Sequence, residues 1–352
     1  MSDNIAPSLT PPARRRRYQG PWRPFWVLLA LLIILAIDGF VSPNFYSLRV
    51  VDGRLLGSMV DILNRSAPII LLATGMTLVI ATKGIDLSVG AVLAISGAVA
   101  ATLIANQPPI VAIGAAILAG LLCGLWNGFL VAVLDIQPII ATLILMVVGR
   151  GIAQMITNGQ IAVFNDPTLM FFGTGVVVGL PFPIYLAFAI VALVSLLMRR
   201  TAIGLLIESV GANDRASYYA GINARLIKLM VYIVSGLCAA IAGLMIAGYI
   251  KGADSNNAGL WSELDAILAV VIGGTALSGG RFHLVMSMVG VLIIQSLYTG
   301  ILVSGLPTQF NLVVKAIVIL LILLVQSDVF RKTIMRPVSM VMPKRQTTGG
   351  LS

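Results

Sequence analysis

Two short stretches of this 352-residue chain end a long apolar run with a lysine, a glycine and an aspartate. They read KGID at 83–86 and KGAD at 251–254, and the residues before them align without a gap. Glycine lets the backbone leave a helix at low cost, and a carboxylate can accept hydrogen bonds from the amides that such a break frees. We interpret four residues as structural turn motifs, with ordinary helix ends as the alternative: Gly84, Asp86, Gly252 and Asp254.

Polar side chains also occur inside the apolar runs, where they are expensive and therefore functional candidates. Arg150 and Gln154 are four residues apart, so they share one helix face. Such groups either line a path for a solute or fix helix packing, with Arg150 paired to Glu263 or Asp265 and Asn127 bonded to a neighbouring helix. Other polar residues in these runs include Gln295 and Lys315. The residues that we predict for a path are Asn127, Arg150, Gln154, Asn158 and Glu263.

Catalytic chemistry has little support in the sequence. There is one histidine, and both cysteines, Cys123 and Cys238, lie in apolar runs, so neither a metal site nor a disulfide framework is indicated. The chain also lacks the Gly-x-x-x-x-Gly-Lys-[Ser/Thr] pattern of nucleotide sites and the Gly-x-Ser-x-Gly pattern of hydrolases. We therefore expect a transport subunit that is no enzyme and holds no cofactor, with any ATP and Mg²⁺ chemistry on a partner chain.

The composition indicates which elements must position these residues. Apolar residues make up 59% of the chain and charged residues 10%, against about 25% charged in soluble domains. A mean hydropathy of +1.01 and continuous apolar runs indicate membrane-spanning helices, not a β-barrel. We predict an all-α, polytopic membrane protein with about ten transmembrane helices, near 25–42, 66–82, 87–105, 109–134, 138–157, 181–198, 225–250, 263–279, 284–303 and 309–326.

Basic residues predict how these helices are oriented. The run Arg14–Arg17 directly precedes the first span, which indicates a cytoplasmic anchor and not a nucleic-acid site. With the N-terminus inside, 17 of the 23 lysines and arginines fall in inside segments and 4 in outside segments. We therefore predict a multi-pass membrane protein with both termini cytoplasmic. Its parts are a basic cytoplasmic tail 1–24, a transmembrane domain 25–326 and a cytoplasmic tail 327–352.

One inside segment, 199–225, has the composition of a docking site. It is the longest relatively polar segment that connects two spans on the inside of the membrane. Its small residues allow the backbone of another segment to approach closely. We predict a short helix there with a small-residue face on which a partner pushes; an ordinary amphipathic connector is the alternative. The residues expected to couple the chain to that partner are Glu208, Gly211, Ala216, Ala220 and Gly221.

The two Lys-Gly-x-Asp motifs also suggest an internal repeat. An odd number of spans separates them, so the halves that contain them would have opposite orientations in the membrane. Spans 2–5 and 7–10 would then form an inverted repeat, which is a common transporter plan.

Longer motifs resemble a known family. From Asp52 to Gln326, the chain resembles the permease subunits of bacterial ribose-type sugar ABC importers, above all those of galactofuranose importers. The resemblance rests on DGRLLGSMVDILNRSAPIILLATGMTLVIA, KGIDLSVGA, LWNGFLVAVLDIQPIIATLILMVVGRGIAQMIT, GADSNNAGLWSELDAILAVVIGG and SGGRF.

The resemblance implies a complex. It implies that 25–326 is a permease domain of about ten spans in the bacterial inner membrane. It also implies a separate ATPase, a second permease and a periplasmic binding protein that delivers a galactofuranose-like monosaccharide. It also implies that 211–221 is the coupling helix; whether the second permease is identical or a paralogue stays open.

Two positions depart from the family pattern: Lys83 stands where a glycine is usual, and Asp214 stands where many members have proline. An ion-coupled secondary sugar carrier is the alternative function.

Overall fold

The computed structural model describes residues 23–51, 53–305, 307 and 310–326. The predicted tail 327–352, and the predicted tail 1–24 except for its last two residues, lie outside this range.

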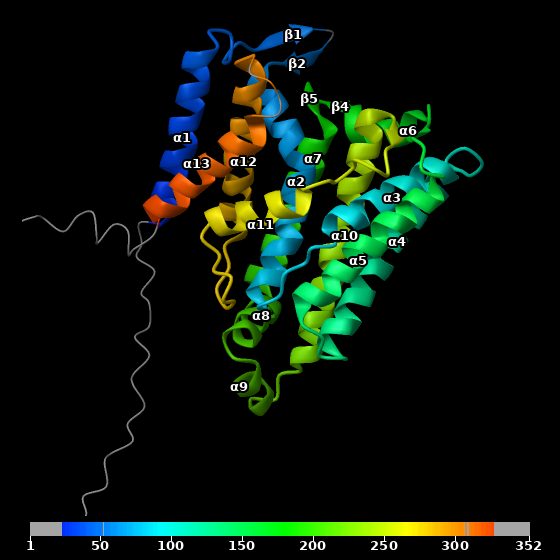
Figure 1. Ribbon diagram of the computed structural model, residues 1–352, viewed down its shortest axis with the longest axis vertical. Coiled ribbons are helices and arrows are strands. Elements are labelled where there is room, and N and C mark those ends of the chain that lie inside the picture. The colour runs from blue at the N-terminus through cyan, green and yellow to red at the C-terminus, as the bar shows by residue number, and fades with distance from the viewer. Residues whose placement is uncertain (1–22, 52, 306, 308–309, 327–352) are drawn as a thin grey trace, which may run out of the picture.

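The first half of the described chain is helical, with three short strand segments (Figure 1). Its elements are α1 (Arg23–Val41), β1 (Arg49–Val51), β2 (Arg54–Leu56), α2 (Ser58–Ala81), α3 (Val89–Leu103), α4 (Pro109–Ala132), α5 (Pro138–Ile156), β3 (Ala162–Val163) and α6 (Pro167–Thr174). Proline opens α4, α5 and α6, because its fixed φ suits a first helical turn and its missing N–H is not needed there.

The second half of the described chain is also mainly helical, with three short strand segments. Its elements are β4 (Val176–Val177), β5 (Leu180–Pro181), α7 (Phe182–Arg200), α8 (Ala202–Ala212), α9 (Asp214–Tyr219), α10 (Ala224–Ile250), β6 (Gly252–Ala253), α11 (Ser262–Ile272), α12 (Leu284–Val303) and α13 (Phe310–Gln326). The strands pair antiparallel as β1–β2, β3–β6 and β4–β5. The predicted helical membrane fold is confirmed; these short strand pairs were not predicted.

The predicted count of about ten spans is not confirmed. Among the described residues, six helices are long and apolar enough to cross a bilayer: α2, α4, α5, α7, α10 and α12. The predicted span 263–279 is wrong, because α11 has 11 residues and ends at Ile272. At 1.5 Å per residue it is about 16 Å long, roughly half of a bilayer core. Gly274, with φ of 88°, turns the chain immediately after it.

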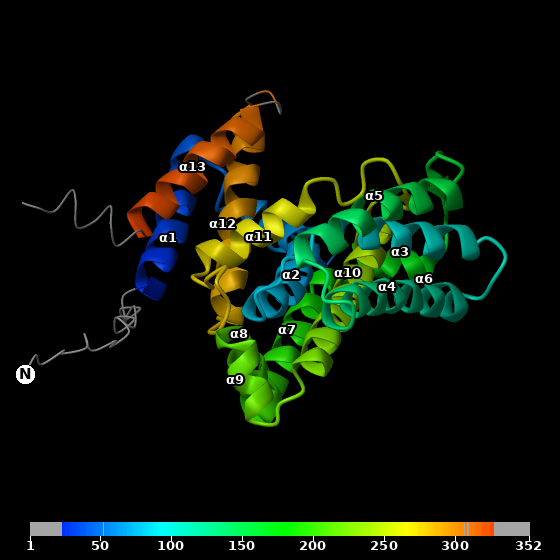
Figure 2. The same cartoon turned by 60° about the horizontal axis from the view of Figure 1, so that its bottom comes forward.

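Two helices organise the packing. Helix α10 packs against α2, α3, α4 and α6, whereas α12 packs against α1, α2 and α11. Helix α2 therefore joins the two groups, which lie on either side of it in Figures 1 and 2. Small residues permit the tightest of these contacts: a Cβ on Gly236 of α10 would lie 2.3 Å from the carbonyl oxygen of Gly120 in α4.

The two ends of the bundle differ. The β1–β2 hairpin marks one end and α8 with α9 mark the other, along the longest axis of the molecule (Figure 1). We call these the hairpin end and the α9 end. Both Lys-Gly-x-Asp motifs follow the C-terminus of a long helix, α2 in one case and α10 in the other.

Candidate functional site

The first Lys-Gly-x-Asp motif is a helix break built around a buried carboxylate. Helix α2 ends at Ala81, and Lys83 adopts a left-handed φ of 66° while the Gly84 N–H bonds back to the Val79 carbonyl at 3.0 Å. Asp86 is 2% exposed, and its Oδ1 accepts from the Ser88 N–H at 3.0 Å and from Ser88 Oγ at 2.7 Å. The carboxylate thus holds the start of α3 against the end of α2.

This carboxylate also connects three helices. Ser235 of α10 donates to Asp86 Oδ2 at 2.8 Å, and Asn127 Nδ2 of α4 donates to Ser88 Oγ at 2.8 Å. The Asn127 side chain is 1% exposed. Of the residues predicted for a path, Asn127 therefore lies beside the first turn motif, where it bonds one helix to another.

Lys83 departs from the family pattern at a position where its backbone conformation favours glycine. Its side chain reaches the segment that follows α7: Nζ donates to the Ala212 carbonyl at the end of α8, at 3.2 Å. The lysine thereby ties the first helix break to α8.

The second motif begins with a similar backbone. Lys251 is left-handed, with φ of 56°, and β6 directly after it pairs with β3. Asp254 accepts hydrogen bonds from the side chain and the N–H of Asn257 and from the N–H of Asn256, and these bonds hold the pKa of this carboxyl below its usual range. Asp254 shapes its own loop, in contrast to Asp86, which bonds to a distant helix.

Helix α5 holds this second loop in place. Arg150 Nη1 donates to the carbonyls of Ser255 at 3.3 Å and Ala258 at 2.5 Å, and Gln154 Nε2 donates to Asn256 Oδ1 at 2.8 Å. The expected ion pair from Arg150 to Glu263 or Asp265 is not formed in the described chain, because backbone carbonyls lie closer to the guanidinium. Asp265 instead pairs with Lys315 of α13, at 2.8 Å.

The residues predicted for a path do not form one cluster. Asn158 is exposed where α5 ends, with a left-handed φ of 52°. Glu263 is buried in the first turn of α11 and lies against α3: a Cβ on Gly90 would be 2.4 Å from Glu263 Oε2. Arg150 and Gln154 both bond to the second loop, whereas Asn127 bonds to the first turn motif.

The segment 199–225 is two helices, so the single helix predicted there is wrong. Asn213 is extended, with φ of −160°, and its side chain accepts from the Ala216 N–H at 3.1 Å, which ends α8 and starts α9. The predicted small-residue face is divided accordingly. Gly211 is buried and Glu208 half-buried, whereas Ala216, Ala220 and Gly221 are exposed.

The buried part of this segment packs inside the chain. A Cβ on Gly211 would lie 1.8 Å from the Ala81 carbonyl oxygen and 2.6 Å from the Gly280 nitrogen. The Gly280 N–H itself donates to the Ala81 carbonyl at 2.9 Å. We call this meeting of Ala81, Gly211 and Gly280 the glycine junction. It joins the end of α8, the end of α2 and the loop between α11 and α12.

The exposed part presents aromatic rings. Tyr218 and Tyr219 of α9 are 73% and 86% exposed, and their rings meet edge to face with centroids 5.9 Å apart. Neighbouring Arg215, Ala216 and Ala220 are exposed as well. Exposed aromatic and arginine side chains together are typical of a protein-binding surface.

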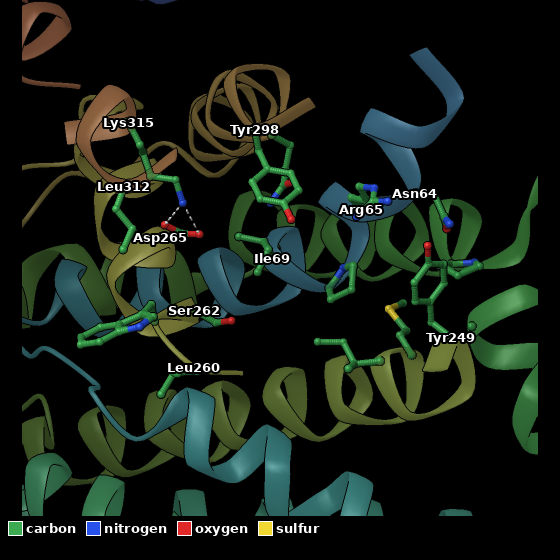
Figure 3. Close-up of a pocket in the computed structure, with 17 residues that line it drawn as sticks. Asn64, Arg65, Ile69, Tyr249, Leu260, Ser262, Asp265, Tyr298, Leu312 and Lys315 are labelled. Carbon is green, nitrogen blue, oxygen red and sulfur yellow. Dashed lines mark hydrogen bonds and ion pairs between the residues drawn. The ribbon is translucent and has the colours of Figure 1, made fainter. Parts of the chain in front are cut away.

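A cavity of about 360 Å³ lies between α2, α10, α11, α12 and α13 (Figure 3). Asn64 and Tyr249 lie at one end of it and the Asp265–Lys315 ion pair lies at the other, with Tyr298 between them. The predicted path residues are not among its lining residues. The sequence shows Asp265, Gln295 and Lys315 as polar residues within or beside apolar runs. It does not show that they lie near the aromatic residues of α10 and α12 that line the same cavity.

Several apolar helices long enough to cross a bilayer, helices interrupted by turns and a cavity between them are together typical of membrane transport proteins. The chain matches a family described as the permease component of the branched-chain amino acid transport system, over residues 58–323, and it belongs to that family. This membership confirms the predicted class, a permease of the ABC sugar-importer type.

Several well-described permeases are similar to the chain. It is 56% identical to the galactofuranose transporter permease of Escherichia coli, over 94% of this chain and 96% of that one. It is 40% identical to the fructose import permease of Bifidobacterium longum, over 86% and 87%, and 37% identical to the ribose import permease of Escherichia coli, over 85% and 92%. No solved structure matches the chain.

Proposed function

We propose that the chain forms the membrane path for a monosaccharide of the galactofuranose type, which a periplasmic binding protein delivers and a separate ATPase drives inward. The observation that carries this proposal is the 56% identity to a galactofuranose transporter permease, which extends over nearly the full length of both chains. The ribose and fructose permeases, at 37% and 40% identity, support the wider class of substrate.

The α9 end is proposed to face the cytoplasm and to receive the ATPase. Ala216, Ala220 and Gly221 lie on the exposed surface there, together with Tyr218 and Tyr219, which supports docking. Glu208 and Gly211 would then act behind that surface, where α8 meets the body of the permease. With this orientation both termini are cytoplasmic, as the distribution of basic residues favours.

The inverted repeat is part of the proposal. Helices α2–α5 and α10–α13 each begin with a long helix that ends in a left-handed lysine and an interrupted Gly-x-Asp segment, which supports it. On this plan α1, α3, α11 and α13 complete about ten membrane segments, α11 as a half-helix. Asn127, Arg150, Gln154, Asn158 and Glu263 are retained as candidates for path residues, and a second permease, identical or paralogous, completes the pair.

The proposal is tested with the full complex of permease pair, ATPase and binding protein in proteoliposomes. We expect sugar-dependent ATP hydrolysis and uptake that stops when both ATPase sites are disabled. Uptake that continues without ATP hydrolysis contradicts the proposal. Uptake driven by an ion gradient alone would instead establish the secondary carrier.

A further inference from the structure

We propose that the cavity between α2, α10, α11, α12 and α13 is a transit site for one neutral monosaccharide, an inference that rests on the proposed function. Its volume of about 360 Å³ falls at the lower end of the roughly 300–1,000 Å³ of small-molecule sites. A single sugar ring fits such a volume, whereas an oligosaccharide does not.

The cavity contains hydrogen-bonding groups that the protein leaves unused. Gln295 of α12 is 9% exposed and lines the cavity, and its amide makes no hydrogen bond with the described residues. Asn64 Oδ1, on the opposite side in α2, is also buried without a partner. A buried polar atom without a partner costs about 1–3 kcal/mol, so the Asn64 oxygen, together with the unbonded amide of Gln295 in the same cavity lining, indicates a polar occupant.

The chemistry of the wall selects the class of occupant. An amide offers both donors and an acceptor, which matches the hydroxyl groups of a sugar. Tyr249, Trp261 and Tyr298 add aromatic faces against which the C–H side of a sugar ring can pack. The Lys315 ammonium is engaged by both oxygens of Asp265, at 2.8 and 3.0 Å, so this pair adds no net charge to the wall. The other charged group in the lining is Arg65, whose Cζ lies over the Tyr298 ring, 5.9 Å from its centroid.

The backbone at the cavity supports a role in ligand contact. Trp261 has a left-handed φ of 65°, a conformation that is strained for a residue with a bulky side chain. This residue immediately precedes α11 and follows the loop that Arg150 holds. Strained residues that the surrounding structure maintains tend to lie at ligand sites. The second helix break therefore places an aromatic ring on the cavity.

One test uses Gln295→Met, which keeps an unbranched side chain of similar length and removes the amide. Because the amide has no protein partner, we expect unfolding of the sugar-free complex at the same or a higher temperature than wild type. Sugar uptake per ATP hydrolysed should fall about three- to tenfold, the size of one hydrogen bond. The control is Ser296→Ala, which removes a buried unpaired hydroxyl from the same helix but outside the cavity; its uptake should equal wild type.

A second test measures occupancy directly. Ser262→Cys places a thiol in the cavity wall, in a full-length chain whose Cys123 and Cys238 are replaced by alanine. We expect a methanethiosulfonate reagent to modify this thiol in the assembled complex. D-galactose, D-ribose or D-fructose at about twice its dissociation constant should slow the reaction roughly threefold.

Three results overturn the inference while the wild-type complex still imports sugar. They are normal uptake by Gln295→Met, a Ser262→Cys thiol that no neutral sugar protects, and protection by galactose 1-phosphate alone. A wild-type complex without ATP-driven uptake would instead reject the proposed function. The two failures are therefore distinguishable.

Discussion

Replacing Gly211 with alanine, which adds one methyl group, tests whether movement of α8 is transmitted to the first helix break at 83–86. In Gly211→Ala the new Cβ would lie 1.8 Å from the Ala81 carbonyl oxygen, so this contact must lengthen by about 1.2 Å to reach even 3.0 Å. The atoms it meets belong to the backbone, which cannot rotate away as a side chain can. The end of α8 must therefore move away from α2.

The structure allows an estimate of the effect. Overpacking of this kind costs about 1–3 kcal/mol. The shift would also lengthen the 3.2 Å bond from Lys83 Nζ to the Ala212 carbonyl, which is worth about 0.5–1.5 kcal/mol. We expect the free energy of unfolding to fall by about 2–4 kcal/mol.

The assay separates folding from coupling. The Gly211→Ala complex should retain its ATPase, because the exposed surface of α9 is unchanged, yet import several-fold less sugar per ATP hydrolysed. The matched control is Gly114→Ala in α4, where a Cβ meets no atom within 4 Å and a gain of up to about 1 kcal/mol is expected. A Gly211→Ala complex with wild-type stability and a wild-type ratio of sugar to ATP would refute the role of the glycine junction.

Three further changes address other parts of the molecule. Ala220→Trp adds bulk to the exposed α9 surface at an ordinary backbone conformation, φ of −83°, and should prevent binding of the ATPase in a pull-down without changing membrane insertion; intact binding would place the docking site elsewhere. Asp86→Ala leaves the donors of Ser88 and Ser235 unpaired and should lower the free energy of unfolding by about 3 kcal/mol in a denaturation experiment, so an unchanged value would contradict the network. Lys315→Met leaves the half-buried Asp265 carboxylate without its partner and should destabilise by about 1–3 kcal/mol, whereas the double change with Asp265→Leu should recover most of the loss; equal losses in both would contradict a stabilising pair.

The segment 199–225 shows why its local sequence could predict only part of its environment. Small residues at 211, 216, 220 and 221 predicted close approach of another backbone, and close approach is found. At Gly211, however, the neighbour is Ala81 of the same chain, not a partner. The size of a residue limits how near a neighbour can come, but it does not show which part of the structure that neighbour is.

Much of the architecture could be predicted from the sequence by itself. The predicted spans 109–134 and 138–157 correspond to α4 and α5 within two residues, because the length of an apolar run and the prolines that open it are local properties. The same holds for the two helix breaks, where glycine and aspartate stand together at the ends of apolar runs. Family membership followed from motifs that are likewise contiguous.

The tertiary structure alone decided the partners of each polar group. It assigned Arg150 to backbone carbonyls, Asp265 to Lys315 and Asp86 to Ser235, the last across 149 positions of sequence. It also brought Gln295 and Asn64 to one cavity from two helices. These pairings depend on which helices become neighbours and how each is rotated about its axis. Apolar side chains all round a membrane helix are compatible with many such arrangements, and only packing of the whole bundle selects one.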